Sequence, residues 1–127
     1  MQWLKNLFTG APSAPPVHVD DSNFEDEVMR SQLPVVVDFW SPSCGPCMQL
    51  APVIMKLTAA WEGKVKFVEI NVAEAPRASA RLRVRATPTV VYMRPRGREV
   101  ERTTGFRGRA WHDEIIRTEL IDAPSAD

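Results

Sequence analysis

The two cysteines of the chain stand three residues apart, in the run Cys44-Gly45-Pro46-Cys47. They follow residues 35–40, VVVDFW, which are apolar at nearly every position, as a buried central strand should be. On the first turn of a helix, residues i and i+3 share one face. The first thiol then lies at the positive end of the helix dipole, where a thiolate is favoured. This pair at a strand-to-helix junction predicts thiol–disulfide exchange.

The size and composition of the chain set the class of protein. Its 127 residues are enough for one domain with a core, and 44% hydrophobic with 25% charged residues is ordinary for a globular protein. The formal net charge is zero, which gives no general attraction to nucleic acid or membranes. No apolar run approaches the ~20 residues of a membrane span, and residues 1–8 are too short for a signal peptide. We therefore expect a cytoplasmic protein.

The charges are unevenly distributed. Residues 1–76 hold five Lys/Arg and nine Asp/Glu, whereas residues 77–127 hold eleven Arg and seven Asp/Glu. These arginines indicate either solvated faces of a helix and a hairpin or, as the sharper alternative, a basic rim that steers acidic partners. Nucleic acid is the weaker interpretation, because no aromatic residues alternate with the arginines.

Residues 9–16, TGAPSAPP, indicate an extended linker. We expect an N-terminal extension with this linker at 1–16, a domain at 17–121 and a tail at 122–127. Trp3, Leu4, Leu7 and Phe8 could share one face of a short helix, which is marginal in water. Mobility or packing on the domain is favoured for residues 1–8 over contact with a membrane.

Hydrophobic periodicity predicts strands that alternate with helices in the first part of the chain. We expect strands at 17–19, 35–40, 65–72, 89–93 and 99–104, and helices at 24–33, 44–61, 77–82 and 111–122. Ser22 and Glu25 are placed to form a capping box for the first helix. Residues 95–97, PRG, predict a hairpin turn. The result is an α/β fold whose mixed sheet has helices on both faces and an antiparallel hairpin at one edge.

With its elements in this order, the chain resembles thioredoxins over about residues 17–121. The resemblance is carried by Val37-Asp38-Phe39-Trp40, Cys44-Gly45-Pro46-Cys47, Pro52, Asn71, Thr87-Pro88-Thr89, Gly97 and Gly105-Phe106. It implies the thioredoxin fold, with strand order 1-3-2-4-5 and four flanking helices. It also implies reduction of protein disulfides through a redox-active Cys44–Cys47 disulfide. The implied partners are disulfide-containing client proteins and a thioredoxin reductase.

No bound cofactor is expected, because the chain has no Gly-rich dinucleotide fingerprint. We expect a monomer, from the size of the chain and the absence of a heptad seam.

The chemistry of the cysteine motif can be argued position by position. Cys44, at the helix start, is the expected nucleophile, and Cys47, one turn deeper, is the expected resolving thiol. Gly45 permits a tight turn and close approach of a substrate, and Pro46 fixes φ without leaving an unpaired N–H. Burial of Asp38 in an apolar strand should raise its pKa. The resemblance implies that Asp38 handles the proton of Cys47; the alternative is that it caps a backbone group or pairs with an arginine.

The resemblance also implies a substrate groove. Pro88 matches a cis-proline whose loop faces the cysteines, and the backbone at Thr87 would pair with the substrate strand, as in β-augmentation. Trp40, Gly105 and Phe106 match residues around this groove. Trp40 is equally consistent with core packing.

Two other interpretations of the cysteines are weaker. Zinc is usually held by four ligands, and only His18 and His112 remain as nitrogen donors, far apart in the sequence. An inert structural disulfide is the other alternative.

Three positions depart from the family pattern. Ser43 stands where most thioredoxins have tryptophan, which affects client range, and Met48 stands where lysine or arginine is common. Glu69 stands where lysine often faces the buried aspartate. If Glu69 points inward, two carboxyl groups approach and one pKa rises. Our hypothesis is that Glu69 shares the proton duty with Asp38.

Two rival functions stay open at this point. One is an extracytoplasmic oxidase or isomerase, against which Gly-Pro between the cysteines and the lack of a signal peptide both argue. The other is a non-enzymatic binding module or redox-sensing adaptor that uses the groove near Pro88.

Overall fold

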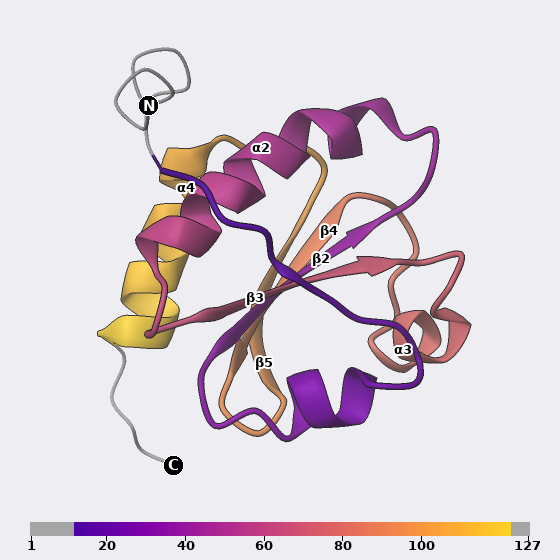
Figure 1. Ribbon diagram of the computed structural model, residues 1–127, viewed down its shortest axis with the longest axis horizontal. Coiled ribbons are helices and arrows are strands. Elements are labelled where there is room, and N and C mark those ends of the chain that lie inside the picture. The colour runs from indigo at the N-terminus through magenta and orange to yellow at the C-terminus, as the bar shows by residue number, and fades with distance from the viewer. Residues whose placement is uncertain (1–11, 123–127) are drawn as a thin grey trace.

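A five-stranded sheet in the order β1-β3-β2-β4-β5 runs through the middle of the protein in the computed structural model, which describes residues 12–122 (Figure 1). The strands are β1 (Val17–His18), β2 (Val35–Trp40), β3 (Lys66–Asn71), β4 (Thr89–Arg94) and β5 (Arg98–Thr104). Strands β1, β3 and β2 are parallel, and β4 is antiparallel to both β2 and β5. The predicted mixed sheet and its strand order are confirmed.

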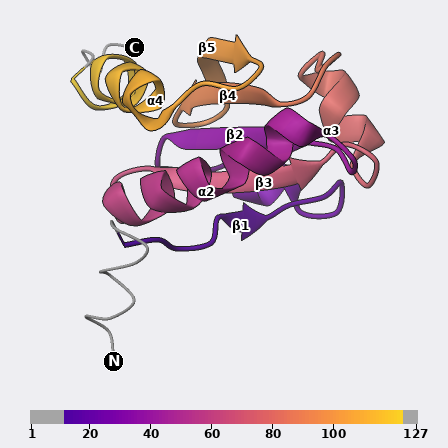
Figure 2. The ribbon, with the colours of Figure 1, turned by 90° about the horizontal axis from the view of Figure 1, so that it is seen from above.

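Within residues 12–122, four helical segments flank this sheet. They are η1 (Glu25–Met29), α2 (Gly45–Ala60), α3 (Pro76–Arg81) and α4 (Arg109–Ile115), which continues directly into η2 (Ile116–Ile121). Figure 2 shows the strands side by side from β1 to β5, with α2 crossing in front of β2 and β3. Helix α2 continues through Pro52 without ending there.

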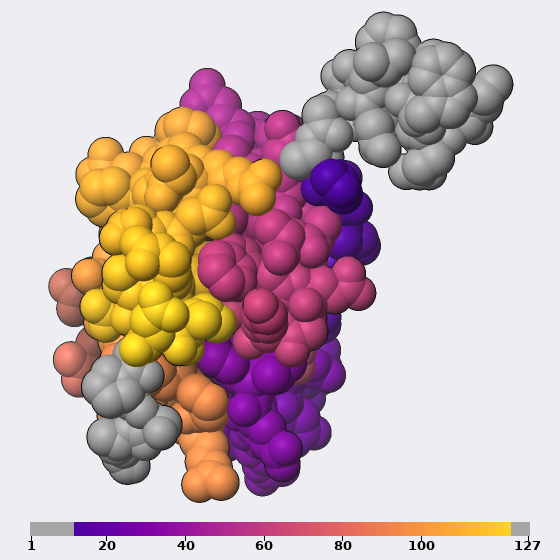
Figure 3. All heavy atoms as spheres, turned by 90° about the vertical axis from the view of Figure 1, so that its left-hand side faces the viewer, coloured from indigo at the N-terminus to yellow at the C-terminus, as the bar shows by residue number. Residues whose placement is uncertain are grey.

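The alternation of side chains along β2 builds two cores. Val37 and Phe39 pack on one face with residues of η1 and α3, whereas Val36 packs on the other with residues of α2 and the C-terminal helix. In Figure 3, α2 (magenta) and the C-terminal helix (yellow) lie side by side on that second face. Because successive side chains of a strand point to opposite faces, Asp38 lies on the α2 side with Val36.

The expected capping box of the first helix is wrong. The Ser22 N–H and hydroxyl both donate to Asp20 Oδ1, at 2.8 and 2.5 Å, and the Asp20 N–H donates to Asn23 Oδ1 at 2.8 Å. These bonds close a turn ahead of the helix. The Ser22 hydroxyl is therefore bonded to Asp20 and does not cap the helix. Glu25 instead pairs with Arg81 at 2.7 Å.

The C-terminal helix buries a residue that the sequence did not single out for the core. Trp111 is 47% exposed, whereas His112 beside it is fully buried. Residues 112, 116 and 120 follow helical spacing and all face the sheet. The hydroxyl of Tyr92, in β4, lies 2.5 Å from His112 Nδ1.

The proline-rich linker lies against the domain over its described part. The Ala14 N–H donates to the Met55 carbonyl of α2 at 3.0 Å. The predictions for residues 1–8 lie outside the described residues. The boundaries at 16/17 and 121/122 stay predictions. Over the described range, no helix combines the length and apolarity needed to cross a membrane.

Several of the C-terminal arginines pair with acidic neighbours. Arg102 contacts Glu99 at 2.6 Å and Arg109 contacts Asp113 at 3.2 Å. These pairs favour the interpretation of the arginines as solvated faces over a rim that steers partners.

Candidate active site

The cysteine pair lies at the junction between β2 and α2. Cys44 is the N-cap of α2, Cys47 lies in its first turn, and the two form a disulfide. The Cys47 N–H donates to Cys44 Sγ at 3.3 Å. Cys47 is 5% exposed, whereas Cys44 is half-buried. Cys44 is therefore the more accessible cysteine, and the helix dipole and this N–H both favour negative charge on its sulfur.

A second loop closes over the same sulfur. The Thr87–Pro88 peptide bond is cis, and the Thr87 carbonyl oxygen lies 3.7 Å from Cys44 Sγ. The hydroxyl groups of Ser41 and Thr87 are 2.7 Å apart, which ties this loop to the segment between β2 and α2. The expected cis-proline opposite the cysteines is present.

Gly105 and Phe106 flank the cis-proline from the end of β5. The Gly105 N–H donates to the Pro88 carbonyl at 2.9 Å, and Gly105 has a φ of 90°, which favours glycine. Phe106 is 40% exposed. An exposed aromatic ring therefore follows directly on the residue that holds the Pro88 loop.

Asp38 is buried behind the disulfide. Its exposure is 6%, and its Oδ1 has no hydrogen-bond partner among the described residues. Burial, and secondarily the charge of Glu69, raises the pKa of Asp38 to about 7. This environment argues against a carboxylate that caps a backbone group or pairs with an arginine. It suits a group that takes up and releases a proton near neutral pH.

One cavity joins the groups that matter for this chemistry. It has a volume of about 290 Å³, and its wall includes Asp38, Glu69, Trp40, Cys47, Met48 and Met55. Asp38 and Cys47 thus face the same space. The cavity is mostly apolar. The local dielectric constant is therefore low, and each charge in the wall interacts more strongly with its neighbours.

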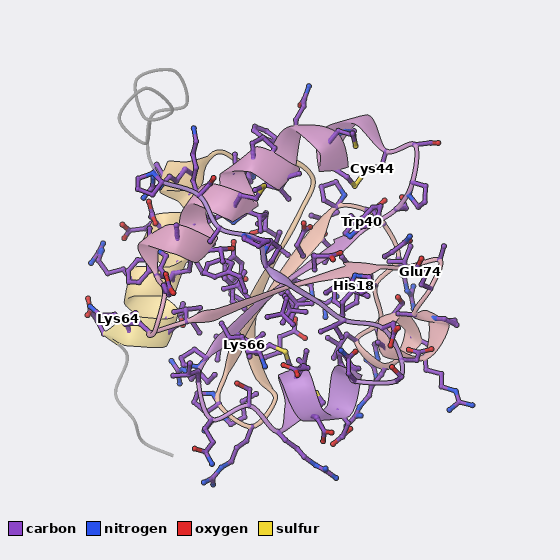
Figure 4. All side chains as sticks on the ribbon, viewed as in Figure 1. His18, Trp40, Cys44, Lys64, Lys66 and Glu74 are labelled. Carbon is purple, nitrogen blue, oxygen red and sulfur yellow. A yellow bond between two sulfur atoms is a disulfide. The ribbon has the colours of Figure 1, made fainter. Side chains whose placement is uncertain are left out.

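Glu69 points into this cavity and is held by two neighbours. Trp40 Nε1 donates to Glu69 Oε1 at 2.5 Å, and His18 Nδ1 lies 2.7 Å from Glu69 Oε2. Trp40 is half-buried, so it both packs in the wall and orients Glu69. Figure 4 shows His18, Trp40 and Cys44 at the end of the sheet where β2 and β3 terminate, with Glu74 beyond them.

Sequence reasoning missed the contact of His18 with Glu69. His18 entered the sequence argument only as a possible zinc ligand. The two cysteines are joined in the disulfide, and His112 lies against Tyr92, so the described residues give no ligand set for zinc. The signal that could have found His18 was the parallel pairing of β1 with β3, which places His18 opposite Glu69.

Comparisons with known proteins agree with this geometry. Residues 15–117 match the protein family described as Thioredoxin. The chain is 41% identical to a thioredoxin of Synechocystis sp. over 87 residues, which are 68% of this chain and 80% of that protein. It is 42% identical over 87 residues to a thioredoxin of Thiocapsa roseopersicina, covering 68% of this chain and 93% of the relative. A chloroplastic M-type thioredoxin of Pisum sativum is 40% identical over 76 residues, 60% of this chain and 44% of its own length.

The family match covers the sheet, the cysteine pair and the loop opposite it. The disulfide at the start of α2 is the redox pair that disulfide exchange requires, and the strand order is the one that the resemblance implied. The chain therefore belongs to the thioredoxin family and is a thiol–disulfide oxidoreductase that reduces protein disulfides.

Proposed function

We propose that Cys44 is the attacking nucleophile and Cys47 the resolving thiol of this reductase. The Cys44 thiolate attacks one sulfur of a client disulfide, forms a mixed disulfide and releases the other client sulfur as a thiolate. The Cys47 thiolate then attacks Cys44 Sγ, forms the Cys44–Cys47 disulfide and releases the second client sulfur. Two electrons pass to the client, and the cysteine pair is oxidised.

Asp38 is the proton acceptor for Cys47 in the second step. The observation that carries this role is the shared cavity: Asp38 and Cys47 both line it, and the pKa of Asp38 is raised to about 7 by burial. A base with a pKa near the working pH is ionised often enough to accept a proton and basic enough to hold it.

The client binds across the loop at Thr87 and Pro88. The backbone of Thr87 pairs with an extended client segment, while Trp40, Gly105 and Phe106 border the groove. The proximity of the Thr87 carbonyl to Cys44 Sγ supports this placement, because a bound strand would carry its disulfide to the nucleophile. Gly45 and Pro46 leave the approach to Cys44 clear, since both are exposed and bear no bulky polar group.

The oxidised protein is re-reduced by a thioredoxin reductase, and it works as a monomer in the cytoplasm. The domain of residues 17–121 carries the activity, with residues 1–16 and 122–127 as accessory segments. The family match over residues 15–117 supports these boundaries. Two relatives, from Pisum sativum and Spinacia oleracea, are described as chloroplastic, so fractionation of the native cells is the test of the compartment.

Trapping of the mixed disulfide tests the assignment of the two thiols. Cys47→Ser should accumulate covalent complexes with client proteins that dithiothreitol releases, and Cys44→Ser should form none. The reverse pattern would refute the assignment. If Cys44→Ser kept both partner binding and biological effect, the protein would act as a binding adaptor rather than through its reductase chemistry.

A further inference from the structure

Three residues from three neighbouring parallel strands form one row on the α2 face of the sheet. His18 of β1 is the register partner of Glu69 of β3, and Glu69 is the register partner of Asp38 of β2. Register partners on adjacent strands project their side chains from the same face. The row therefore leads from an exposed histidine to the buried carboxyl group behind the disulfide.

The middle member of the row is fixed at both oxygens. Glu69 Oε2 lies 2.7 Å from His18 Nδ1, and Glu69 Oε1 accepts from Trp40 Nε1 at 2.5 Å. The Glu69 side chain is 21% exposed and the His18 side chain 55% exposed. The position of the Glu69 carboxylate in the cavity wall thus depends on a contact that opens to solvent.

The charges of the row affect one another's pKa values. The negative charge of Glu69 adds to burial in raising the pKa of Asp38. His18 faces Glu69, Glu74 and Asp20, and all three raise its pKa, chiefly through the hydrogen bond to Glu69. A protonated His18 beside Glu69 offsets the negative charge that Asp38 faces.

We propose that His18 is a positioning residue for the dithiol chemistry: it holds Glu69 against Trp40 and sets how much negative charge faces Asp38. This inference rests on the proposed role of Asp38 as the acceptor of the Cys47 proton. The positive charge in this row comes from β1, through a group that titrates. Protonation of His18 makes Asp38 release its proton more readily, and deprotonation makes it retain the proton.

The test measures the titration of Asp38 directly, by the carboxyl carbon resonance of the full chain over a pH series at low salt. His18→Ala should raise the midpoint of Asp38 by roughly half a pH unit, because it removes one positive charge about two strand spacings away. His18→Lys, which keeps a positive charge, should restore most of the difference. Lys64→Ala removes an exposed positive charge at the opposite end of the sheet (Figure 4) and should leave the midpoint unchanged.

Two further measurements show that His18 acts through Glu69. In a Glu69→Gln background, His18 lacks the hydrogen bond that chiefly raises its pKa, so His18→Ala should move the Asp38 midpoint less than it does in wild type; an equal shift in both backgrounds would show that His18 does not act through Glu69. In the His18→Ala variant alone, the Trp40 indole N–H resonance should shift, because its acceptor is no longer held. An Asp38 midpoint that is equal in wild type and His18→Ala would overturn the inference.

The kinetic readout separates this inference from the proposed function. The pH profile of mixed-disulfide resolution should move upward in His18→Ala by the same amount as the Asp38 midpoint. If Asp38→Asn left resolution unchanged, the catalytic role of Asp38 would fail, and His18 would lose its part in the reaction even where the midpoint moved. If Asp38→Asn slowed resolution but His18→Ala moved neither midpoint nor profile, only the inference about His18 would fail.

Discussion

Asp38 and Glu69 are register partners on the adjacent parallel strands β2 and β3, so two carboxyl groups project from the same face of the sheet into one cavity. Asp38 has no hydrogen-bond partner at Oδ1 among residues 12–122, whereas Glu69 is held at both oxygens. One carboxyl group is therefore left to exchange a proton, and the other is anchored as a nearby charge. The raised pKa of Asp38 supports its role as a proton acceptor, and the hypothesis that Glu69 shares this duty stays a prediction, which the pH profile of Glu69→Gln tests.

The resolving step should depend on the ionisation of Asp38. In wild type, the rate at which Cys47 resolves a preformed mixed disulfide should rise with pH through about 7, where Asp38 loses its proton. Asp38→Asn should slow this step on the order of 10²-fold at pH 8 and remove the inflection near 7. Stopped-flow measurement of client release gives the rate. An inflection near 7 that persists in Asp38→Asn would assign it to another group.

The same carboxyl group should make the protein less stable as pH rises. The folded-state pKa of about 7 lies above the ordinary value of 3.8, so the folded protein retains a proton that the unfolded chain has released. The free energy of unfolding attributable to Asp38 therefore falls between pH 3.8 and 7, by up to about 4 kcal/mol. The free energy of unfolding of Asp38→Asn, relative to that of wild type, should therefore be higher at pH 8 than at pH 4. Urea denaturation at the two pH values measures both free energies.

A matched control for this stability effect is Asp26→Asn. Asp26 is an exposed aspartate of η1 whose side chain pairs with Arg30 on the surface, where an ion pair contributes less than about 1 kcal/mol. Its difference from wild type should be nearly the same at both pH values. A difference for Asp38→Asn that does not grow with pH would show that burial of this carboxyl group costs the fold little.

His112 should make the protein less stable as pH falls, which is the opposite of the effect of Asp38. Burial lowers its pKa below 6.5, so the folded state holds the neutral imidazole beside the Tyr92 hydroxyl. The stability that this provides is present above pH 6.5 and is lost as pH falls through the lowered folded-state pKa. His112→Gln keeps a polar partner for Tyr92 without the titration.

The measurement is the difference in unfolding free energy between wild type and His112→Gln at pH 7 and pH 5. Because the contributions of Asp38 and other distant groups are common to both proteins, they cancel in this difference. The advantage of wild type should shrink at pH 5. An advantage that is constant between the two pH values would mean that the folded protein accepts the histidine proton without cost.

Much of this fold follows from local sequence patterns. Residues 35–40 are apolar enough to be a central strand in any arrangement, and the cysteine motif after them marks the start of a helix. The contacts that the sequence analysis missed are non-local. His18 meets Glu69 only because β1 pairs with β3, 51 residues away. The burial of His112 in place of Trp111 depends on which way the last helix faces, and hydrophobicity alone favoured the tryptophan.

Some features of the site could likewise be predicted from the sequence, and others could not. The raised pKa of Asp38 could be predicted from its apolar neighbours in sequence, and the cis bond at Pro88 from the resemblance to a family. The anchoring of Glu69 could not be predicted, because a carboxylate in that position could face inward without a partner. Ser22 shows the limit at the smallest scale: it has the right type for a helix cap but is engaged by Asp20 two residues earlier.

The hairpin turn between β4 and β5 should be intolerant of a side chain at Gly97. This residue has a φ of 75°, and a Cβ atom built there lies 2.5 Å from Met29 Cε. Gly63 provides the matched control, because its φ is 84° but a Cβ atom there meets nothing within 4 Å. Gly63→Ala should therefore cost only the left-handed backbone strain, about 1 kcal/mol, whereas Gly97→Ala should cost about 1 kcal/mol more for displacing Met29.

Urea denaturation of the two variants measures the difference, and a second background identifies its source. With Met29→Ala present, Gly97→Ala should cost no more than Gly63→Ala, because the atom that the new methyl group meets has been removed. Equal costs at the two glycines in the wild-type background would show that the Met29 side chain moves aside freely. In that case backbone conformation alone, rather than packing of the hairpin against η1, would account for glycine at position 97.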